Sequence, residues 1–169
     1  VFKEAYGLDF PFMESYTEVK RIYHEKYDGG KLPLKPGVEE ILTILKEKGF
    51  KLGLASSSLI KDVTQELKDA KLYDYFDVVM GGDMIEHSKP DPEIFLKTAK
   101  SLGCEPDKCF VVEDSYNGVR AGFAGGFKTI MVPDLLPPTD ETKEKATVTM
   151  SSSRIFFFIM SWFAVRRNL

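Results

Sequence analysis

Short apolar segments alternate with amphipathic ones along residues 34–132, and this alternation restricts the possible folds more than any other feature of the sequence. Strands are predicted at residues 50–56, 76–80, 110–112 and 129–132, and helices at residues 34–49, around residues 63–70, and at residues 93–102 and 118–124. Strands joined in this way by helices form right-handed crossovers and a parallel sheet that is covered on both faces. The sequence therefore predicts an α/β fold.

Local signals support the ends of two of these helices. Gly49 and Gly103 each follow the last apolar residue of a helical pattern, where glycine is a typical stop. Asp91 and Pro92 precede the helix at residues 93–102 and are typical of an N-cap and a first-turn proline. These signals predict that the helix begins at residue 93 and ends at residue 102.

Residues 1–33 precede the alternating pattern and contain one further amphipathic helix. Tyr16, Val19, Tyr23 and Tyr27 lie three or four positions apart and therefore share one helical face. A single helix of this kind is marginal in water unless it packs on another element. We expect residues 1–33 to be part of a helical appendage, joined to the rest by a linker that contains glycine and proline.

Residues 151–169 differ in composition from the rest of the chain. They contain three arginines, the only tryptophan, no lysine and no acidic residue. The run from Ile155 to Val165 is apolar on every face of a helix, and it is too short to cross a membrane. We expect this tail to be a packing-incompetent extension whose deletion improves solubility.

The composition argues against several classes of protein. Hydrophobic residues make up 43% and charged residues 29%, which is ordinary for a globular domain. The net charge of −3 is too small for a nucleic-acid-binding surface or a polybasic membrane face. Two cysteines cannot form the disulfide framework of a small secreted protein. We therefore expect a cytoplasmic monomer that binds neither nucleic acid nor a membrane.

Polar side chains follow three successive predicted strands. Ser56 ends the first strand, Lys89 lies in the loop after the second, and Glu113 and Asp114 follow the third. In an open parallel sheet, ligands bind at the carboxyl ends of the strands. A hydroxyl and an ammonium group can hold a phosphoryl group, and carboxylate oxygens suit Mg²⁺. The sequence therefore predicts a site for phosphoryl transfer.

Each of these residues also has a purely structural interpretation. A serine at a strand end, such as Ser56 or Ser57, is usually a turn or cap residue. Lys89 could be a solvated loop charge, and Glu113 and Asp114 could favour the positive end of the following helix. Their placement at three successive strand ends favours a shared site over separate structural roles.

Three segments resemble motifs of the haloacid dehalogenase (HAD) superfamily. They are residues 54–56 (Leu-Ala-Ser), residues 88–95 (Ser-Lys-Pro-Asp-Pro-Glu-Ile-Phe) and residues 112–115 (Val-Glu-Asp-Ser), the last followed by Gly118 and Ala121. Their order and spacing match the second, third and fourth motifs of the superfamily. The chain is similar to the phosphatase and β-phosphoglucomutase branch, with a weaker similarity to pseudouridine-5′-phosphatase-like members.

The resemblance implies a role for each candidate residue. Ser56 and Ser57 would bind phosphoryl oxygens, with Ser56 counted among the catalytic residues. Lys89, the second catalytic residue, would also bind the phosphate and neutralise the nucleophile. Glu113 and Asp114 would hold Mg²⁺, the implied cofactor.

One motif of the superfamily is absent from this sequence. The family nucleophile is the first aspartate of an Asp-x-Asp motif, and the 169 residues contain no Asp-x-Asp. The resemblance therefore implies a fragment: a Rossmann-like core at residues 34–150 that lacks its first strand, and an incomplete helical cap at residues 1–33. We expect such a chain to be inactive alone.

The implied activity of the intact protein is Mg²⁺-dependent hydrolysis of a small phosphate monoester through an aspartyl-phosphate. A sugar phosphate or a nucleoside phosphate, that is, a small phosphorylated metabolite, would be the substrate. A β-phosphoglucomutase-like phosphosugar mutase shares every motif that this chain contains, and a non-catalytic phosphate-binding remnant is a further alternative.

Overall fold

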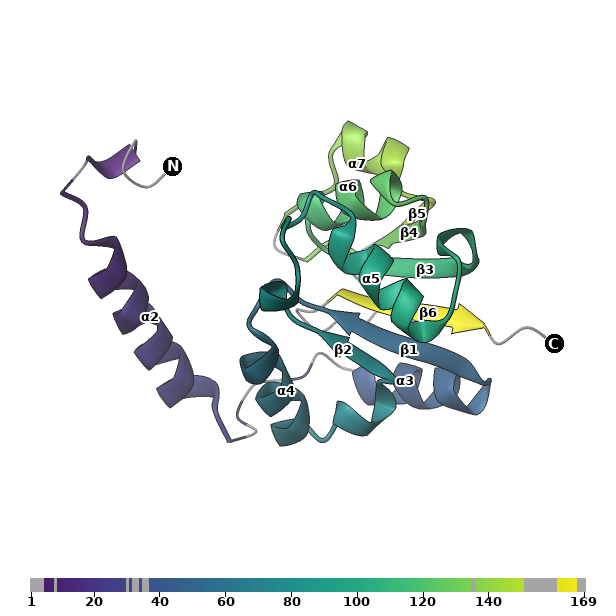
Figure 1. The fold of residues 1–169 in the computed structure, drawn as a ribbon, viewed down its shortest axis with the longest axis horizontal. Coiled ribbons are helices and arrows are strands. Elements are labelled where there is room, and N and C mark those ends of the chain that lie inside the picture. The colour runs from purple at the N-terminus through teal and green to yellow at the C-terminus, as the bar shows by residue number, and fades with distance from the viewer. Residues whose placement is uncertain are drawn as a thin grey trace. The chain divides into compact units, whose positions relative to one another are not determined.

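The structure, a computed structural model, divides the chain into two units, residues 1–33 and residues 34–169. It describes residues 5–7, 9–29, 31, 34, 37–134 and 136–150, together with the backbone of residues 161–166. The first unit contains helix α2 (Phe12–Tyr27), and the second contains a sheet with its covering helices (Figure 1).

Helix α2 follows the periodicity of its sequence. Aromatic rings four positions apart lie against each other, with centroid distances of 5.0 Å for Tyr23 and Tyr27 and 5.9 Å for Phe12 and Tyr16. None of its residues is buried in the described part of the first unit. The assignment of this helix to an incomplete cap stays a prediction.

The second unit is built around a six-stranded sheet with the strand order β2-β1-β6-β3-β4-β5. The strands are β1 (Phe50–Ala55), β2 (Val78–Met80), β3 (Cys109–Glu113), β4 (Lys128–Met131), β5 (Val148–Thr149) and β6 (Ser161–Arg166). β1 pairs in parallel with β2, β3 with β4, and β4 with β5. These pairs confirm the parallel α/β architecture that the alternating pattern predicts.

Helices and short 3₁₀ turns connect the strands. The helices are α3 (Val38–Glu47), α4 (Ile60–Asp69), α5 (Glu93–Leu102), α6 (Tyr116–Ala124) and α7 (Asp140–Lys145), and the 3₁₀ turns are η1 (Tyr73–Tyr75), η2 (Gly82–Met84) and η3 (Pro106–Lys108). Helix α5 has the predicted bounds, and Gly103 ends it with a φ of 69°. This left-handed conformation is costly for residues with a Cβ, which explains the glycine.

The helices cover both faces of the sheet (Figure 1). On one face, α3 and α4 pack on β1 through Val38, Leu42, Leu52, Leu54, Val63 and Leu67. On the other face, α5 and α6 contribute Ile94, Phe95, Ala99, Leu102 and Ala121. Successive side chains of a strand point to opposite faces. Val111 of β3 therefore enters the second core, whereas Val112 enters the first.

Strand β6 corrects the interpretation of the tail. It runs antiparallel between β1 and β3, and Trp162 lies opposite both Leu54 of β1 and Val112 of β3. The expectation of a packing-incompetent extension is therefore wrong for residues 161–166, whose backbone fills the middle of the sheet. Residues 151–160, which belong to the same predicted tail, lie outside the described residues.

Some local features differ from the sequence patterns. The assigned N-cap of α5 is Pro92, one residue after the predicted Asp91, but the Asp91 carboxylate accepts the N–H of Glu93 at 2.9 Å and so makes the hydrogen bond expected of the predicted cap. The patterns do not reveal α7 or β5, because six and two residues are too short to show a period. Thr139 and Thr142 begin α7 with reciprocal hydrogen bonds between side chain and backbone.

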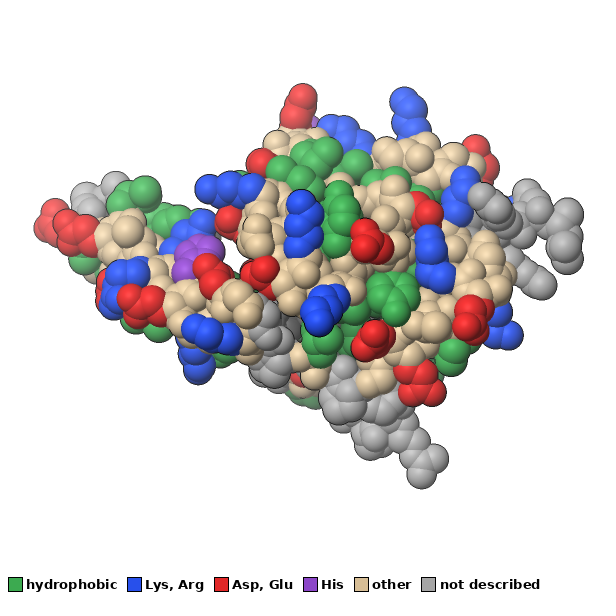
Figure 2. Space-filling view, turned by 90° about the horizontal axis from the view of Figure 1, so that it is seen from below, with side chains coloured by type: hydrophobic (Ala, Val, Ile, Leu, Met, Phe, Trp, Pro, Cys, Tyr) green, Lys and Arg blue, Asp and Glu red, His purple; other side chains and the backbone are tan. Residues whose placement is uncertain are grey.

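The described surface carries charges of both signs. On the face drawn in Figure 2, lysine and arginine side chains are interspersed with acidic ones. Among the residues that the structure describes, no helix is both long enough and apolar enough to span a membrane. The expectations that the protein binds neither nucleic acid nor a membrane stay predictions.

Candidate functional site

Segments that follow β1, β2 and β3 meet at the edge of the sheet where these three strands end. The Nζ of Lys89, from the loop between β2 and α5, donates to Glu113 Oε1 at the end of β3 over 2.7 Å. The same group donates a longer bond of 3.4 Å to the carbonyl of Ala55, the last residue of β1. Ser56 follows Ala55 directly in the chain. Lys89 therefore links the two strand ends where the sequence places its candidate site.

The Lys89–Glu113 ion pair is buried. Only 9% of the lysine side chain and 1% of the glutamate side chain are exposed. The ammonium group also lies 4.8 Å from the centre of the Phe95 ring, a distance typical of a cation–π contact. This geometry contradicts the alternative that Lys89 is a solvated loop charge.

The second oxygen of Glu113 holds the start of α6. Its Oε2 accepts hydrogen bonds from the Ser115 hydroxyl at 2.8 Å and from the Ser115 N–H at 3.3 Å. Ser115 is the N-cap of α6, and its own Oγ accepts the N–H of Gly118 at 3.0 Å. Glu113 thus connects the Lys89 loop, β3 and the first turn of α6. Its assignment as a Mg²⁺ ligand stays a prediction.

Gly118 allows this close packing. A Cβ at position 118 would lie 1.8 Å from the carboxyl carbon of Glu113, far inside any van der Waals contact. There is therefore a steric reason for glycine at this position of the fourth motif. Its missing side chain leaves room for the Glu113 carboxylate, which holds Lys89.

We expect Gly118→Ala to destabilise the protein by about 1–3 kcal/mol, the usual penalty of overpacking. Helix propensity alone predicts the opposite sign, because alanine is favoured over glycine by about 1 kcal/mol inside a helix. Urea unfolding of the variant measures the difference, with Asn117→Ala, an exposed position of the same helix, as the control. A Gly118→Ala variant that is more stable than the wild type would show that the Glu113 carboxylate moves aside easily.

Asp114 lies in a region of accumulated negative charge. Its side chain is partly buried, and burial raises its pKa. The neighbouring carboxylates of Glu113 and Asp134 raise that pKa further, whereas Lys89 acts in the opposite direction. A cation beside Asp114 would relieve this repulsion, and carboxylate oxygens are ligands that Mg²⁺ prefers. Asp114 therefore fits a magnesium ligand, although the described residues hold no cluster of three or more typical ligand side chains.

The serine loop after β1 is held by the loop after β2. Ser56 Oγ accepts a hydrogen bond from the N–H of Ser58 at 3.1 Å. In this arrangement the Ser56 hydroxyl group can still donate a hydrogen bond to a ligand. Ser58 in turn accepts the N–H of Gly82 at 2.7 Å. A Cβ on Gly82 would lie 2.4 Å from the carbonyl oxygen of Ser57, so the two loops approach as closely as glycine permits.

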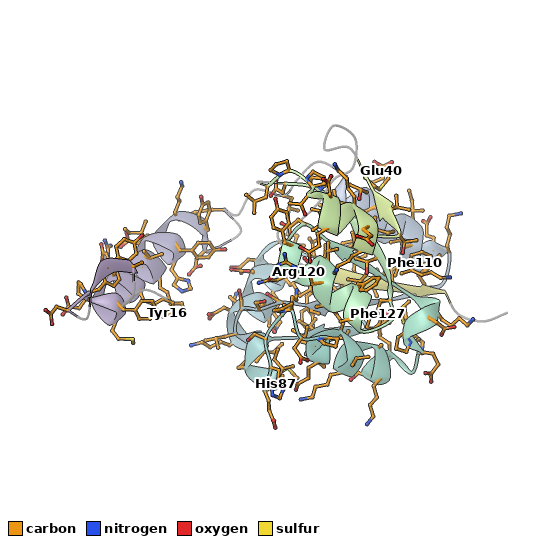
Figure 3. The ribbon with its side chains drawn as sticks, turned by 90° about the horizontal axis from the view of Figure 1, so that it is seen from above. Tyr16, Glu40, His87, Phe110, Arg120 and Phe127 are labelled. Carbon is orange, nitrogen blue, oxygen red and sulfur yellow. The ribbon has the colours of Figure 1, made fainter. Side chains whose placement is uncertain are left out.

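Some residues around the site escaped the sequence analysis. Phe95 and Ser115 stand within the matched motifs, but the contacts of their side chains depend on tertiary packing. Asp134 follows β4, so extending the strand-end rule to the fourth strand would have found it. His87, only two residues from Lys89, is 68% exposed and lies on the outside of its unit (Figure 3).

The chain is similar to a family of hydrolases and to individual phosphatases. The family model described as a haloacid dehalogenase-like hydrolase matches residues 6–132. A phosphorylated carbohydrates phosphatase of Thermotoga maritima is 38% identical over 115 residues, which are 68% of this chain and 51% of that protein. Hexitol phosphatase B of Escherichia coli K12 is 37% identical over 120 residues, which are 71% of this chain and 54% of that protein.

A solved structure has a similar fold. The crystal structure of a β-phosphoglucomutase from Clostridium difficile superposes with a TM-score of 0.68 and 27% sequence identity. The match covers 88% of this chain and 64% of that one. The chain spans about half the length of the curated relatives it matches.

Proposed function

The chain belongs to the haloacid dehalogenase-like hydrolases, and on that basis we propose that it forms the phosphate-binding part of a phosphatase for small phosphate monoesters. The observation that carries the proposal is the buried Lys89 ammonium group, held between the carboxyl ends of β1 and β3. A fixed positive charge at this edge complements a phosphoryl group. The phosphatases of Thermotoga maritima and Escherichia coli to which the chain is similar support the same class of reaction.

Each candidate residue has a chemical role in this proposal. The Ser56 hydroxyl group donates a hydrogen bond to a phosphoryl oxygen, and Ser57 belongs to the same loop. Lys89 offsets the negative charge of the phosphoryl oxygens and of the attacking group. Glu113 keeps the ammonium group in place, because a preorganised charge needs no reorganisation when the reaction occurs.

Mg²⁺ is the proposed cofactor of the whole protein. Asp114 would hold it, since this partly buried carboxylate already lies among other negative charges. A bound Mg²⁺ would supply charge stabilisation at the phosphoryl oxygens. Glu113 would support the same region while its two oxygens accept from Lys89 and Ser115.

The proposal separates binding from turnover. The 169 residues contain no Asp-x-Asp motif, so we expect this chain to bind phosphate without hydrolysing esters. In the whole protein, the proposed nucleophile is an aspartate outside these residues, acting through an aspartyl-phosphate. The proposed partner is a small phosphorylated metabolite such as a sugar or nucleoside phosphate, and the proposed setting is a cytoplasmic monomer.

Titration with inorganic phosphate, followed by ³¹P NMR in the presence of Mg²⁺, tests the binding function. We expect saturable binding by the wild-type chain, and a loss of affinity of about threefold to tenfold in Ser56→Ala, the effect of one lost hydrogen bond. Ser101→Ala is the matched control, because Ser101 is an exposed serine near the far end of α5. Absence of binding, or equal affinity in Ser56→Ala, would overturn the proposal.

A phosphosugar mutase is the second candidate, favoured by the similarity to the β-phosphoglucomutase structure. A mutase must accommodate two phosphate groups on one sugar, whereas a phosphatase needs contacts with only one. Binding of a hexose bisphosphate at least tenfold tighter than that of a hexose monophosphate would favour the mutase.

A further inference from the structure

The loop that carries Lys89 has little regular structure of its own. Residues 85–92 connect η2 with α5 and contain neither helix nor strand. Within the loop, the N–H of Asp91 donates to the carbonyl of Ser88 at 3.1 Å. A loop of this kind needs other contacts to hold a buried lysine in one place.

Glu93, the first residue of α5, supplies such contacts. Its Oε2 accepts the N–H of His87 at 2.8 Å, and its two oxygens accept the N–H of Glu86 at 3.1 and 3.2 Å. The His87 ring lies 3.0 Å away through Nδ1, and Lys97 pairs with Oε1 at 2.6 Å. Lys97 and these two backbone N–H groups lower the pKa of Glu93 to about 2, so the carboxylate is charged at neutral pH.

The helix behind Glu93 is firmly anchored. Ile94 and Phe95 are fully buried in the core beneath α5. The Phe95 ring also contacts the Lys89 ammonium group, so one turn of α5 reaches the loop at two places. The carboxylate of Glu93 fixes the loop before Lys89, and the ring of Phe95 supports the end of the lysine side chain.

We propose that Glu93 is the positioning residue of the Lys89 loop, which fixes the backbone of residues 86 and 87 and so holds the Lys89 ammonium group against Glu113. The proposal rests on the proposed function only in that it treats Lys89 as the phosphate-binding charge. Its structural part concerns where Lys89 is held and can be tested without any substrate.

A simpler interpretation makes Glu93 one half of a surface ion pair with Lys97. Ion pairs between residues four positions apart on a helix contribute little to stability when they are exposed to solvent, and the Lys97 side chain is 45% exposed. If the ion pair were the function of Glu93, removing Lys97 would have the same consequence as removing Glu93. If the backbone contacts matter, the two variants differ.

The reactivity of Lys89 toward an acetylating reagent distinguishes these interpretations. Peptide mass spectrometry measures the acetylation rate of Lys89. We expect Glu93→Ala to raise this rate by about tenfold or more. The loss of a hydrogen bond to a charged group shifts the equilibrium between the buried and the exposed Lys89 side chain by about that factor. Lys97→Met is expected to leave the rate within about twofold. Glu93→Gln keeps an acceptor oxygen for the backbone N–H groups and is expected to restore much of the protection.

Glu141→Ala is the matched control, because Glu141 pairs with Arg120 between α6 and α7 at 2.6 Å and lies on other elements. An equal rise in Lys89 reactivity in Glu141→Ala or Lys97→Met, or no rise in Glu93→Ala, would overturn the proposal. Phosphate titration of the same variants separates the two claims. Wild-type chain that fails to bind inorganic phosphate contradicts the proposed function, whereas the acetylation result bears on Glu93 alone.

Discussion

Replacing Ala164 by proline is expected to lower the free energy of unfolding by about 3 kcal/mol or more, or to abolish cooperative unfolding altogether. Ala164 lies in the middle of β6, opposite Leu52 of β1 and Phe110 of β3. A residue that pairs with strands on both sides donates its N–H to one of these two strands. Proline has no N–H, so the substitution removes that hydrogen bond. Circular dichroism during thermal and urea unfolding measures the effect.

Ala164→Gly is the control for this substitution, since it keeps the N–H and changes only propensity, by about 1 kcal/mol. Equal stability of the proline variant and the glycine variant would mean that β6 is not paired in solution.

Deletion of residues 151–169 tests the same strand in a different way. The composition of the tail predicts that its removal improves solubility, whereas the position of β6 predicts the reverse. Without β6, the facing edges of β1 and β3 lose their hydrogen-bonding partners in the middle of the sheet. We expect lower soluble yield from the shorter chain than from the full chain.

The contrast between α5 and β6 shows what the sequence alone can predict. Helix α5 combines a clear 3.6-residue period with a stopping glycine, and its bounds follow from the sequence. The segment before Arg166 lacks a one-sided helical stripe, and that test cannot recognise a strand. A continuous apolar run is also typical of a strand in the middle of a sheet that is covered on both faces. The absence of a helical stripe therefore does not exclude a buried strand in the tail.

The candidate site shows a similar division between position and contact. The strand-end rule places Ser56, Lys89 and Glu113 at one edge of the sheet, and the structure brings Lys89 to Glu113. That rule concerns the backbone and carries no information on where a side chain points. The contact of Lys89 with Phe95 and the steric need for Gly118 arise only when α5 and α6 pack on the sheet.

The largest effect expected from single side chains concerns the Lys89–Glu113 pair. Lys89→Met is expected to lower the free energy of unfolding by about 3–5 kcal/mol, because it removes the positive charge beside a carboxylate that is 1% exposed. Glu113→Leu is expected to have a comparable effect, because it leaves the ammonium group in the same buried place. Urea unfolding of both variants, followed by circular dichroism, gives the two values.

The double variant Lys89→Met/Glu113→Leu separates electrostatics from packing. A buried ion pair exchanged for apolar side chains of similar volume often leaves stability unchanged or improved, because neither charge then has to lose its water. We therefore expect the double variant to be more stable than either single variant, which means that the coupling energy exceeds the loss of about 3–5 kcal/mol caused by each single substitution. Losses that simply add would show that the two side chains act independently. The double variant should also fail to bind inorganic phosphate, since a stable fold without the Lys89 charge lacks the group that the proposed function requires.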